Sequence, residues 1–411
     1  MLGREDVGQR SETVRRANLS AIVRALHLRG PLSRSELVAS TGLTRSAIRS
    51  LVGDLVAGEF VVEEAAVRLG TPGRPSPQVR LLDESAVVLA LEIAVDSAAV
   101  AVVGLGGHVL WERRVERPRG HSSLEEIVDD LTTLAAAARA RRPAGERPIG
   151  VGVAVAGLVN RANGVVAFAP NLGWVNVPLG ARLGEALALG VPVSVDNEAD
   201  LGALAEFRRG AARDASDVLY VHAEVGIGGG LIVDGLPVSG SAGFAGEIGH
   251  MPVNPAGLTC RCGSIGCWET EVGEGALLAR AGYPIEGGSA AVAAVLADAA
   301  AGRPEALIAL ADVGRWLGIG LAGLVNILNP SRVVLGGLFS RIYPFVAAVV
   351  ETELDRRALA APRRLVSVVP ASLGVEAPLF GAAEMTFEPL LTDPVAWLGP
   401  RTPFIQLATA G

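Results

Sequence analysis

A compact cluster of metal-binding residue types constrains the fold of this chain more than any other feature. Residues 246–270, "GEIGHMPVNPAGLTCRCGSIGCWET", contain all three cysteines of the 411-residue chain and one of its five histidines. His250, Cys260, Cys262 and Cys267 have the spacing His-x9-Cys-x-Cys-x4-Cys. One imidazole and three thiolates form a tetrahedral ligand set for a structural Zn²⁺ ion, with no open position for catalytic water. A redox pair or buried free thiols would leave the spacing of His250 unexplained. The sequence therefore predicts one structural zinc ion per chain.

Cysteine usage and hydropathy indicate the compartment. Three cysteines in one cluster do not suggest a disulfide framework, and an odd number argues further against one. The N-terminus "MLGREDVGQRSETVRR" is charged and lacks the apolar core of a signal peptide. The apolar runs are interrupted by charges or are too short to span a bilayer. We therefore expect a cytoplasmic protein of two or three domains with no membrane partner.

The first 60 residues have the pattern of three short helices. Apolar residues recur at helical spacing from Leu19 to Leu26, and Gly30-Pro31 ends that run. A second helix is expected to begin after its N-cap Ser33, and a third after its N-cap Thr44, with Gly42 free to adopt positive φ between them. The side chains of the third helix that we expect to face inward are Ala47, Ile48, Leu51, Leu55 and Val56.

Two helices joined by a glycine turn are typical of the helix-turn-helix motif. The residues at the start of its second helix that we expect to contact DNA are Thr44, Arg45, Ser46, Arg49 and Ser50. Residues 60–82 are predicted to form two strands around a Gly/Pro-rich turn, the wing of a winged helix, with Arg74 at its tip to enter a minor groove. The alternative is a helical bundle with a hairpin that binds another protein. The arginines on the outward face of the third helix and the Gly/Pro-rich wing favour operator DNA as the partner. Residues 1–80 hold 12 arginines against 8 acidic residues in a chain whose net charge is −7, which indicates that this segment and the body meet different partners.

Strand-like and helix-like runs alternate from residue 86 onward, and this pattern predicts two α/β lobes with a cleft between them. We expect a winged helix-turn-helix domain over 1–82, a first lobe over 83–200, and a second lobe over 201–411 that includes the zinc site and a C-terminal helical segment. The final stretch, "PVAWLGPRTPFIQLATAG", is apolar enough to pack back on the body and to couple it to the N-terminal domain.

Several motifs of the body resemble those of the ROK family of repressors, open-reading-frame proteins and sugar kinases. They are "PNLGWVNVPL", "DNEADLGALAE", "VGIGGGLI", "GEIGH", "CRCGSIGCWE", "LVNILNPSRVVLGG" and "LGVEAPLFGAAE". The resemblance extends almost throughout residues 86–390. The resemblance implies a two-lobed fold of the actin/hexokinase type. With the winged helix in front, the chain resembles the branch of the family that contains sugar-responsive transcription factors.

The resemblance also implies a sugar site around the metal cluster. In the family, the positions of Glu247, His250 and Glu269 meet sugar hydroxyls, and Asn171 and Asn197-Glu198 complete the site from the other lobe. Carboxylates and imidazole are strong partners for vicinal hydroxyl groups. Taken alone, Asn171 would be read as a turn residue and Glu198 as a solvated helix N-terminus.

The phosphate-binding loops of the catalytic members are altered in this chain. Where kinases have DxGGT, the sequence reads "LEIAVDS". Glu92 stands for the Asp, Ala94 and Val95 replace the two glycines, and Asp96 replaces the Thr. The second loop, "EVGIGGG", begins with a negative charge, and Glu198 stands at the catalytic Asp position. Phosphoryl transfer depends on positioning, so these changes argue against kinase activity.

The predicted function is a sugar-responsive repressor of carbohydrate metabolism genes, acting as a homodimer or homotetramer. Its predicted partners are operator DNA and a sugar or sugar derivative as effector, and its predicted cofactor is zinc. The alternative is an ATP-dependent, glucokinase-like sugar kinase with an accessory DNA-binding domain.

Overall fold

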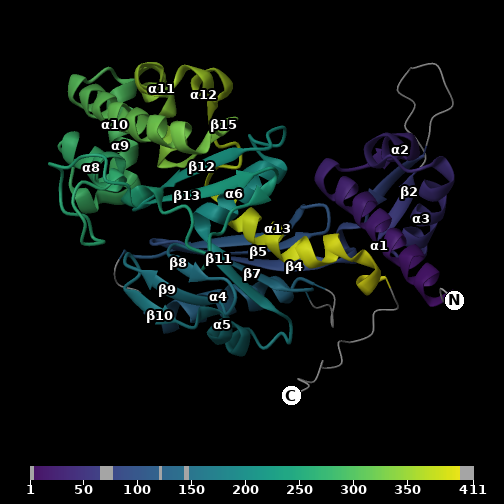
Figure 1. The fold of residues 1–411 in the computed structure, drawn as a ribbon. Helices are drawn as coiled ribbons and strands as arrows, with labels where there is room; N and C mark the ends of the chain where they lie inside the picture. Colours follow the sequence, from purple (N-terminus) through teal and green to yellow (C-terminus); the bar gives the residue numbers. More distant parts are fainter. Residues whose placement is uncertain (1–3, 65–76, 120–122, 143–147, 399–411) are drawn as a thin grey trace.

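The computed structural model describes residues 4–64, 77–119, 123–142 and 148–398. In this part of the chain, an N-terminal helical domain lies at one end of a larger body built around two five-stranded sheets (Figure 1).

Three helices and a small antiparallel sheet form the N-terminal domain. The helices are α1 (Arg4–Arg29), α2 (Arg34–Thr41) and α3 (Arg45–Ala57), and the sheet has the order β1 (Leu32–Ser33), β3 (Gln78–Leu81), β2 (Val61–Glu64). Ser33 and Thr44 are the N-caps of α2 and α3, and Gly42 has a φ of +71°, as predicted. Strands β2 and β3 are antiparallel. Arg74, expected at the tip between them, lies outside the described residues.

The buried face of α3 differs from the prediction at Val52, which is buried but was not predicted to be, and at Val56. Ile48, Leu51, Val52 and Leu55 are buried, whereas Val56 is 42% exposed. At about 100° per residue, Ile48 lies between Leu55 and Val52 on the helix surface, and Val56 lies beyond Val52, outside this stripe. The expectation that Val56 faces inward was therefore wrong.

The first lobe contains a mixed five-stranded sheet. Its order is β11 (Val193–Asn197), β7 (Val151–Val155), β4 (Val87–Ile93), β5 (Ser97–Gly104), β6 (Val109–Glu116), parallel from β11 to β4 and antiparallel from β4 to β6. One face packs against α4 (Leu124–Arg139) and α5 (Leu179–Leu187). A small antiparallel sheet, β8 (Leu158–Asn160), β9 (Val165–Ala169) and β10 (Trp174–Val177), extends the same core.

The second lobe contains the other five-stranded sheet. Its order is β14 (Leu236–Pro237), β13 (Ile227–Val233), β12 (Val218–Ala223), β15 (Arg332–Gly337), β16 (Ser367–Pro370). The helices on its outer face are α7 (Trp268–Val272), α8 (Glu274–Arg280), α9 (Gly288–Ala300), α10 (Pro304–Leu328) and α11 (Leu338–Arg357), followed by the short α12 (Ala360–Leu365). Among the described helices, α10 alone is long and apolar enough to cross a membrane, but most of it is buried in this core.

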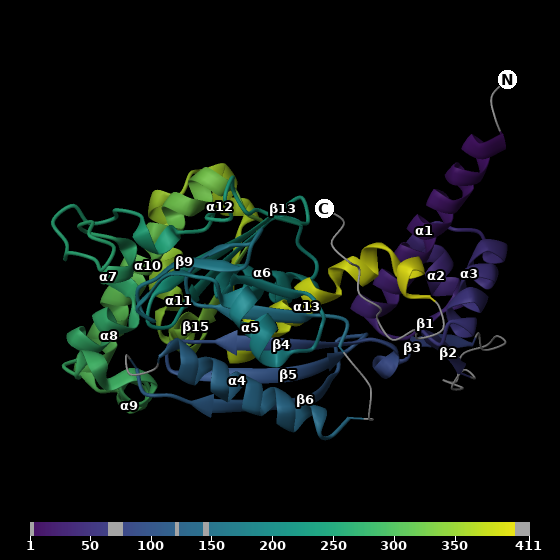
Figure 2. The ribbon, with the colours of Figure 1, turned by 90° about the horizontal axis from the view of Figure 1, so that it is seen from below.

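Two helices lie side by side between the sheets (Figures 1 and 2). Helix α6 (Glu198–Arg209) packs on β12 and β13, and α13 (Ala377–Thr392) packs on β4 and β7. Gly381 permits their close approach, because an added Cβ would lie 1.9 Å from Leu201 O. The expected division at residue 200 stays a prediction, but α13 returns from the second lobe to cover the first sheet.

The C-terminal segment packs against the N-terminal domain as far as the structure describes it. The short helix η5 (Pro394–Trp397) contacts α1 and α13. Val395, Trp397 and Leu398 pack on the same apolar core as Leu19 and Leu55. The expectation that this segment packs back on the body is confirmed for residues 394–398, which contact both α13 and α1.

Candidate metal centre and lobe junction

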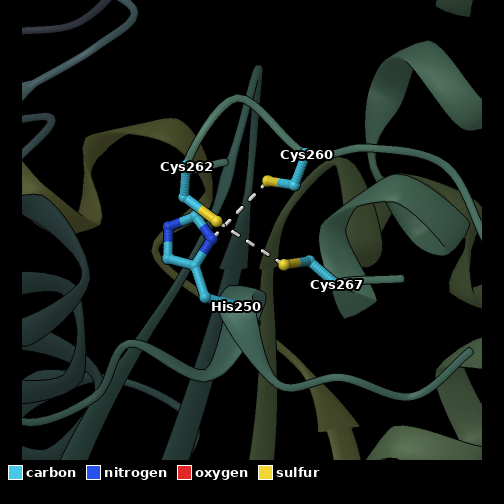
Figure 3. A group of neighbouring side chains, drawn as sticks. All are labelled: His250, Cys260, Cys262 and Cys267. Atoms are coloured by element: carbon cyan, nitrogen blue, oxygen red, sulfur yellow. Dashed lines mark hydrogen bonds between the residues drawn. The ribbon is translucent and has the colours of Figure 1, made fainter. Parts of the chain in front are cut away.

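The three cysteines and His250 converge on one point (Figure 3). His250 ends the short helix η2 (Ile248–His250), and the cysteines lie on the loop that leads into α7. Cys260 Sγ lies 3.7 Å from His250 Nδ1, and Cys262 Sγ lies 3.6 Å from Cys267 Sγ. All four ligand atoms lie within 4.8 Å of one another. A tetrahedral Zn²⁺ with Zn–S bonds of ~2.3 Å places its ligand atoms ~3.8 Å apart, so this donor set fits the ion.

Glycines and a buried tryptophan set the shape of the cysteine loop. Gly263 and Gly266 have φ values of +90° and +72°, and an added Cβ on Gly266 would lie 1.6 Å from Asn254 O. Trp268 follows the last cysteine and is fully buried, and its Nε1 donates to Trp316 O on α10 at 2.9 Å. The loop is therefore fixed to the core of the second lobe.

The thiols need a cation to ionise together. Burial raises the pKa of Cys260 to about 12, and burial also raises the pKa of Cys267. The pKa of Cys262 is lowered by the backbone N–H of Ser264. A bound dication favours all three thiolates at once, which couples metal binding to the folding of the loop.

Two of the predicted sugar-binding carboxylates flank the metal cluster. Glu269 Oε1 lies 3.6 Å from Cys260 Sγ, and its Oε2 accepts from Ile227 N at 3.1 Å. Glu247 Oε2 lies 3.9 Å from His250 Nε2, on the side of the ring away from Cys260. The Glu247 and His250 side chains are 40% and 35% exposed, so both are accessible to a ligand.

Asn171 reaches this cluster from the first lobe. It lies on the loop between β9 and β10, and its Oδ1 accepts from Arg261 Nη1 at 2.6 Å. An added Cβ on Gly226 would meet both Glu269 Oε2, at 2.9 Å, and Asn171 Nδ2, at 3.4 Å. The structure therefore brings Asn171 and Glu269 together. Sequence reasoning missed Arg261, although its place between two cysteines could have indicated it.

Asn197 and Glu198 begin helix α6. Asn197 Oδ1 caps the helix by accepting from Ala199 N at 2.7 Å, and its Nδ2 donates to Gly157 O at 2.8 Å. The Asn197 amide therefore mainly fixes the start of α6 and retains one free N–H. The Glu198 carboxylate lies within 4.8 Å of ligand atoms of His222 and Glu224. Sequence reasoning missed His222, whose only signal is a histidine in an apolar strand.

Ion pairs occupy the positions that correspond to the first kinase phosphate loop. Arg114 Nη2 contacts Glu92 at 2.7 Å and Glu376 at 3.3 Å. Arg119 pairs with Asp96 at 2.8 Å and, across the lobe junction, with Glu274 on α8 at 2.5 Å. Of these contacts, the Arg119–Glu274 pair joins the first lobe to α8 of the second lobe.

The glycines of "VGIGGG" have a packing role. Gly228, Gly229 and Gly230 lie within β13, and added Cβ atoms would come within 2.4–2.8 Å of α6 and η2. The clashing atoms belong to Ala199 at Gly228 and Gly230, and to Ile248 at Gly229. The close approach of α6 to β13 therefore requires Gly228 and Gly230, and the approach of η2 requires Gly229, whether or not a phosphate binds.

The predicted DNA-contacting residues lie on an exposed surface. Thr44, Arg45, Ser46, Arg49 and Ser50 are all exposed at the start of α3. Thr44 Oγ1 accepts from Ala47 N at 3.2 Å, so part of its hydrogen-bonding capacity caps the helix. Contact with DNA stays a prediction for these residues and for Arg74.

A buried polar network, which sequence reasoning missed, joins the N-terminal domain to the body. The Glu384 carboxylate on α13 is buried and lies 3.1 Å from His27 Nε2 on α1. Gly106 N donates to His27 Nδ1 at 3.0 Å. His27 Nε2 lies within hydrogen-bond distance of both the Glu384 carboxylate, at 3.1 Å, and Arg209 Nη2, at 2.8 Å. Arg208 and Arg209, at the end of α6, pair with the same carboxylate. Burial opposes ionisation of Glu384, but its contacts with His27, Arg209 and Arg208 outweigh burial and lower its pKa.

The fold and the site define a two-lobed α/β protein with a Cys₃His cluster that could hold a metal ion and an N-terminal helical domain. Its residues 88–388 match the ROK family, and the chain belongs to this family. The expected fold, a hexokinase-like body behind a helical domain, is confirmed.

Relatives of both functional branches match the chain. It is 28% identical over 379 residues to the xylose repressor of Bacillus subtilis, covering 92% of this chain and 97% of the repressor. It is 32% identical over 331 residues to the glucokinase of Streptomyces coelicolor, covering 75% of this chain and 99% of the kinase. A crystal structure of a ROK family transcriptional regulator, a homologue of the E. coli MLC protein, has a TM-score of 0.75 at 23% identity and covers 94% of this chain and 99% of that one.

Proposed function

We propose that the chain is a cytoplasmic, sugar-responsive transcriptional repressor. The observation that carries this function is helix α6, which starts at the lobe junction with Asn197 and Glu198 and ends in the buried network of the N-terminal domain. A rise of about 1.5 Å per residue makes its 12 residues about 18 Å long. One rigid helix thus links the candidate effector site to the DNA-binding domain.

The N-terminal domain acts in this proposal as a winged helix-turn-helix. Helix α3 enters the major groove with Arg45 and Arg49 at its start, and the hairpin of β2 and β3 is the wing that carries Arg74. A homodimer would place two such helices on the half-sites of a palindromic operator. The exposure of the α3 surface supports this role.

The effector is a sugar bound where the two lobes meet. Its contacts are Asn171, Asn197, Glu198, Glu247, His250 and Glu269. His250 Nδ1 and the three cysteine thiolates would hold the zinc ion, which would fix the cysteine loop and leave His250 Nε2–H to meet a hydroxyl group. The xylose-repressor relatives make xylose the first sugar to test.

Sugar binding changes the separation of the lobes, and α6 transmits the change. Arg119–Glu274 and Arg261–Asn171 already bridge the lobes. A sugar that favours one lobe arrangement shifts α6 and therefore the contacts of Arg208 and Arg209 with α13 and α1. The ligand alters DNA affinity only by its difference in affinity for the two arrangements.

Kinase activity is lost in this proposal. Two Cβ groups, at Ala94 and Val95, stand where glycines would let a phosphate approach. The Glu92–Arg114 and Asp96–Arg119 pairs present carboxylates to the same region. An ADP-release assay with glucose, xylose and N-acetylglucosamine should show no turnover, and rates of about 1–100 s⁻¹ would establish a kinase instead.

The test of the repressor function is DNA binding by the full-length protein. Its preferred sequence is first selected from a random DNA pool, and affinity is then measured with and without xylose, glucose and other sugars. Arg49→Ala should weaken binding, whereas Arg182→Ala, an exposed arginine on α5, should leave it unchanged. A chain with no sequence preference, or with DNA affinity indifferent to every sugar, would not be a sugar-responsive repressor.

A further inference from the structure

One histidine at the lobe junction has a buried ring nitrogen without a partner. His222 is the penultimate residue of β12 and is 1% exposed. Within the described part of the chain, its Nε2 has no hydrogen-bond partner, and its nearest charged neighbour is Glu224 Oε1 at 3.8 Å. A buried polar atom left without a hydrogen bond costs about 1–3 kcal/mol, so this nitrogen points to a missing ligand.

The rest of the ring is held in the orientation that metal ligation needs. His222 Nδ1 lies 3.1 Å from Tyr220 Oη, so a proton on Nδ1 leaves the lone pair of Nε2 free. Tyr220 is itself fully buried, and added Cβ atoms on Gly202 and Gly336 would come within 2.5 Å of its ring or hydroxyl. These two glycines fix the tyrosine, and the tyrosine fixes the imidazole.

The surroundings of this nitrogen carry excess negative charge. Ligand atoms of Glu198, His222 and Glu224 all lie within 4.8 Å of one another. The nearest guanidiniums, on Arg114 and Arg119, are already each shared between two other carboxylates. Half-buried carboxylates crowded around one nitrogen without a free counter-charge favour the uptake of a proton or a cation.

We propose that Glu198, His222 and Glu224 form a second metal site, separate from the cysteine cluster, that takes a divalent transition-metal ion. One imidazole and two carboxylates suit Mn²⁺, Co²⁺ or Zn²⁺, and they contain no thiolate. Three protein ligands leave coordination positions open for water or for a hydroxyl group. The site links the start of α6 to β12 and does not depend on the repressor function.

The experiment is a Co²⁺ titration of the full-length protein after one equivalent of Zn²⁺ has filled the cysteine cluster. Zinc binds such ligands more tightly than cobalt and remains there. We expect one further Co²⁺ per chain, with d–d absorption bands and no thiolate charge-transfer band. His222→Ala and Glu224→Gln should abolish this binding, and Tyr220→Phe should weaken it about 10- to 100-fold.

Two controls keep the result interpretable. Glu185→Gln makes the same charge change on the exposed surface of α5 and should bind Co²⁺ like the wild type. Glu198→Gln alters a partly exposed ligand, so its Co²⁺ binding still tests the second metal site if His222→Ala fails to fold. Absence of further Co²⁺ binding, equal binding by the folded ligand variants, or a spectrum showing only thiolate ligation would overturn the second site.

Discussion

Glu384→Gln should loosen the junction between the N-terminal domain and the body. The substitution removes a buried charge that pairs with Arg208 and Arg209 and contacts His27. Breaking one side of a buried ion pair costs about 3–5 kcal/mol, because the remaining charge stays buried without a partner. Since 1.4 kcal/mol corresponds to a factor of ten, the opening equilibrium of the junction should rise by roughly 100-fold or more.

Glu388→Gln is the matched control, one turn further along α13. Glu388 also pairs with Arg24 and Arg208, but its side chain is 41% exposed. Exposed ion pairs contribute about 0.2–1 kcal/mol, so the opening equilibrium should rise about fivefold or less. The assay is hydrogen exchange of the amides of α1, which reports local opening without assuming two-state unfolding. Equal acceleration by the two variants, or less than about tenfold for Glu384→Gln, would refute this account of the junction.

Three further predictions concern the metal cluster and pH. Cys262→Ser should lower the zinc content from one ion per chain to none and should also lower the thermal midpoint. A chelator should lower the thermal midpoint of the wild type by a similar amount. Unchanged metal content in Cys262→Ser would contradict the ligand assignment. Gly266→Ala should also lose zinc, because its Cβ would meet Asn254 O at 1.6 Å. Gly263→Ala has no atom within 4 Å of its Cβ, so it should retain zinc and lose only about 1–2 kcal/mol of folding stability, because of its φ of +90°. Equal loss of zinc in both variants would contradict the steric argument. Burial lowers the pKa of His27, so below about pH 6.5 the unfolded chain binds a proton that the folded chain resists, and stability should fall as the pH drops. Thermal midpoints between pH 7.5 and 5 should show a shallower fall in His27→Gln than in the wild type, and parallel curves would exclude this role for His27.

Local signals in the sequence predicted much of the structure. Ser33 and Thr44 were identified as helix caps because a cap acts on amides two or three residues away. The metal ligands were identified because three of the four lie within eight residues and their chemistry is specific to few ions. The motifs of the body predicted the family, which the comparison with known proteins confirms.

Contacts between distant residues were beyond prediction from spacing. His27 and Glu384 are 357 residues apart, and nothing near either residue indicates the other. His222 becomes a candidate metal ligand only because the fold brings the start of α6, with Glu198, beside β12. The glycine run 228–230 was interpreted as part of a phosphate loop, but the close packing of α6 and η2 on β13 is enough to require it.

In the proposed mechanism, the candidate sugar site and the N-terminal domain share one free-energy coupling through α6. Sugar affinity measured calorimetrically with and without the selected DNA tests it most directly, because linkage requires both ligands to alter each other's affinity by the same factor. We expect the sugar dissociation constant to change by about 5- to 150-fold when DNA is bound, matching the effect of sugar on DNA affinity. A sugar that binds tightly with the same dissociation constant in both states would contradict the account.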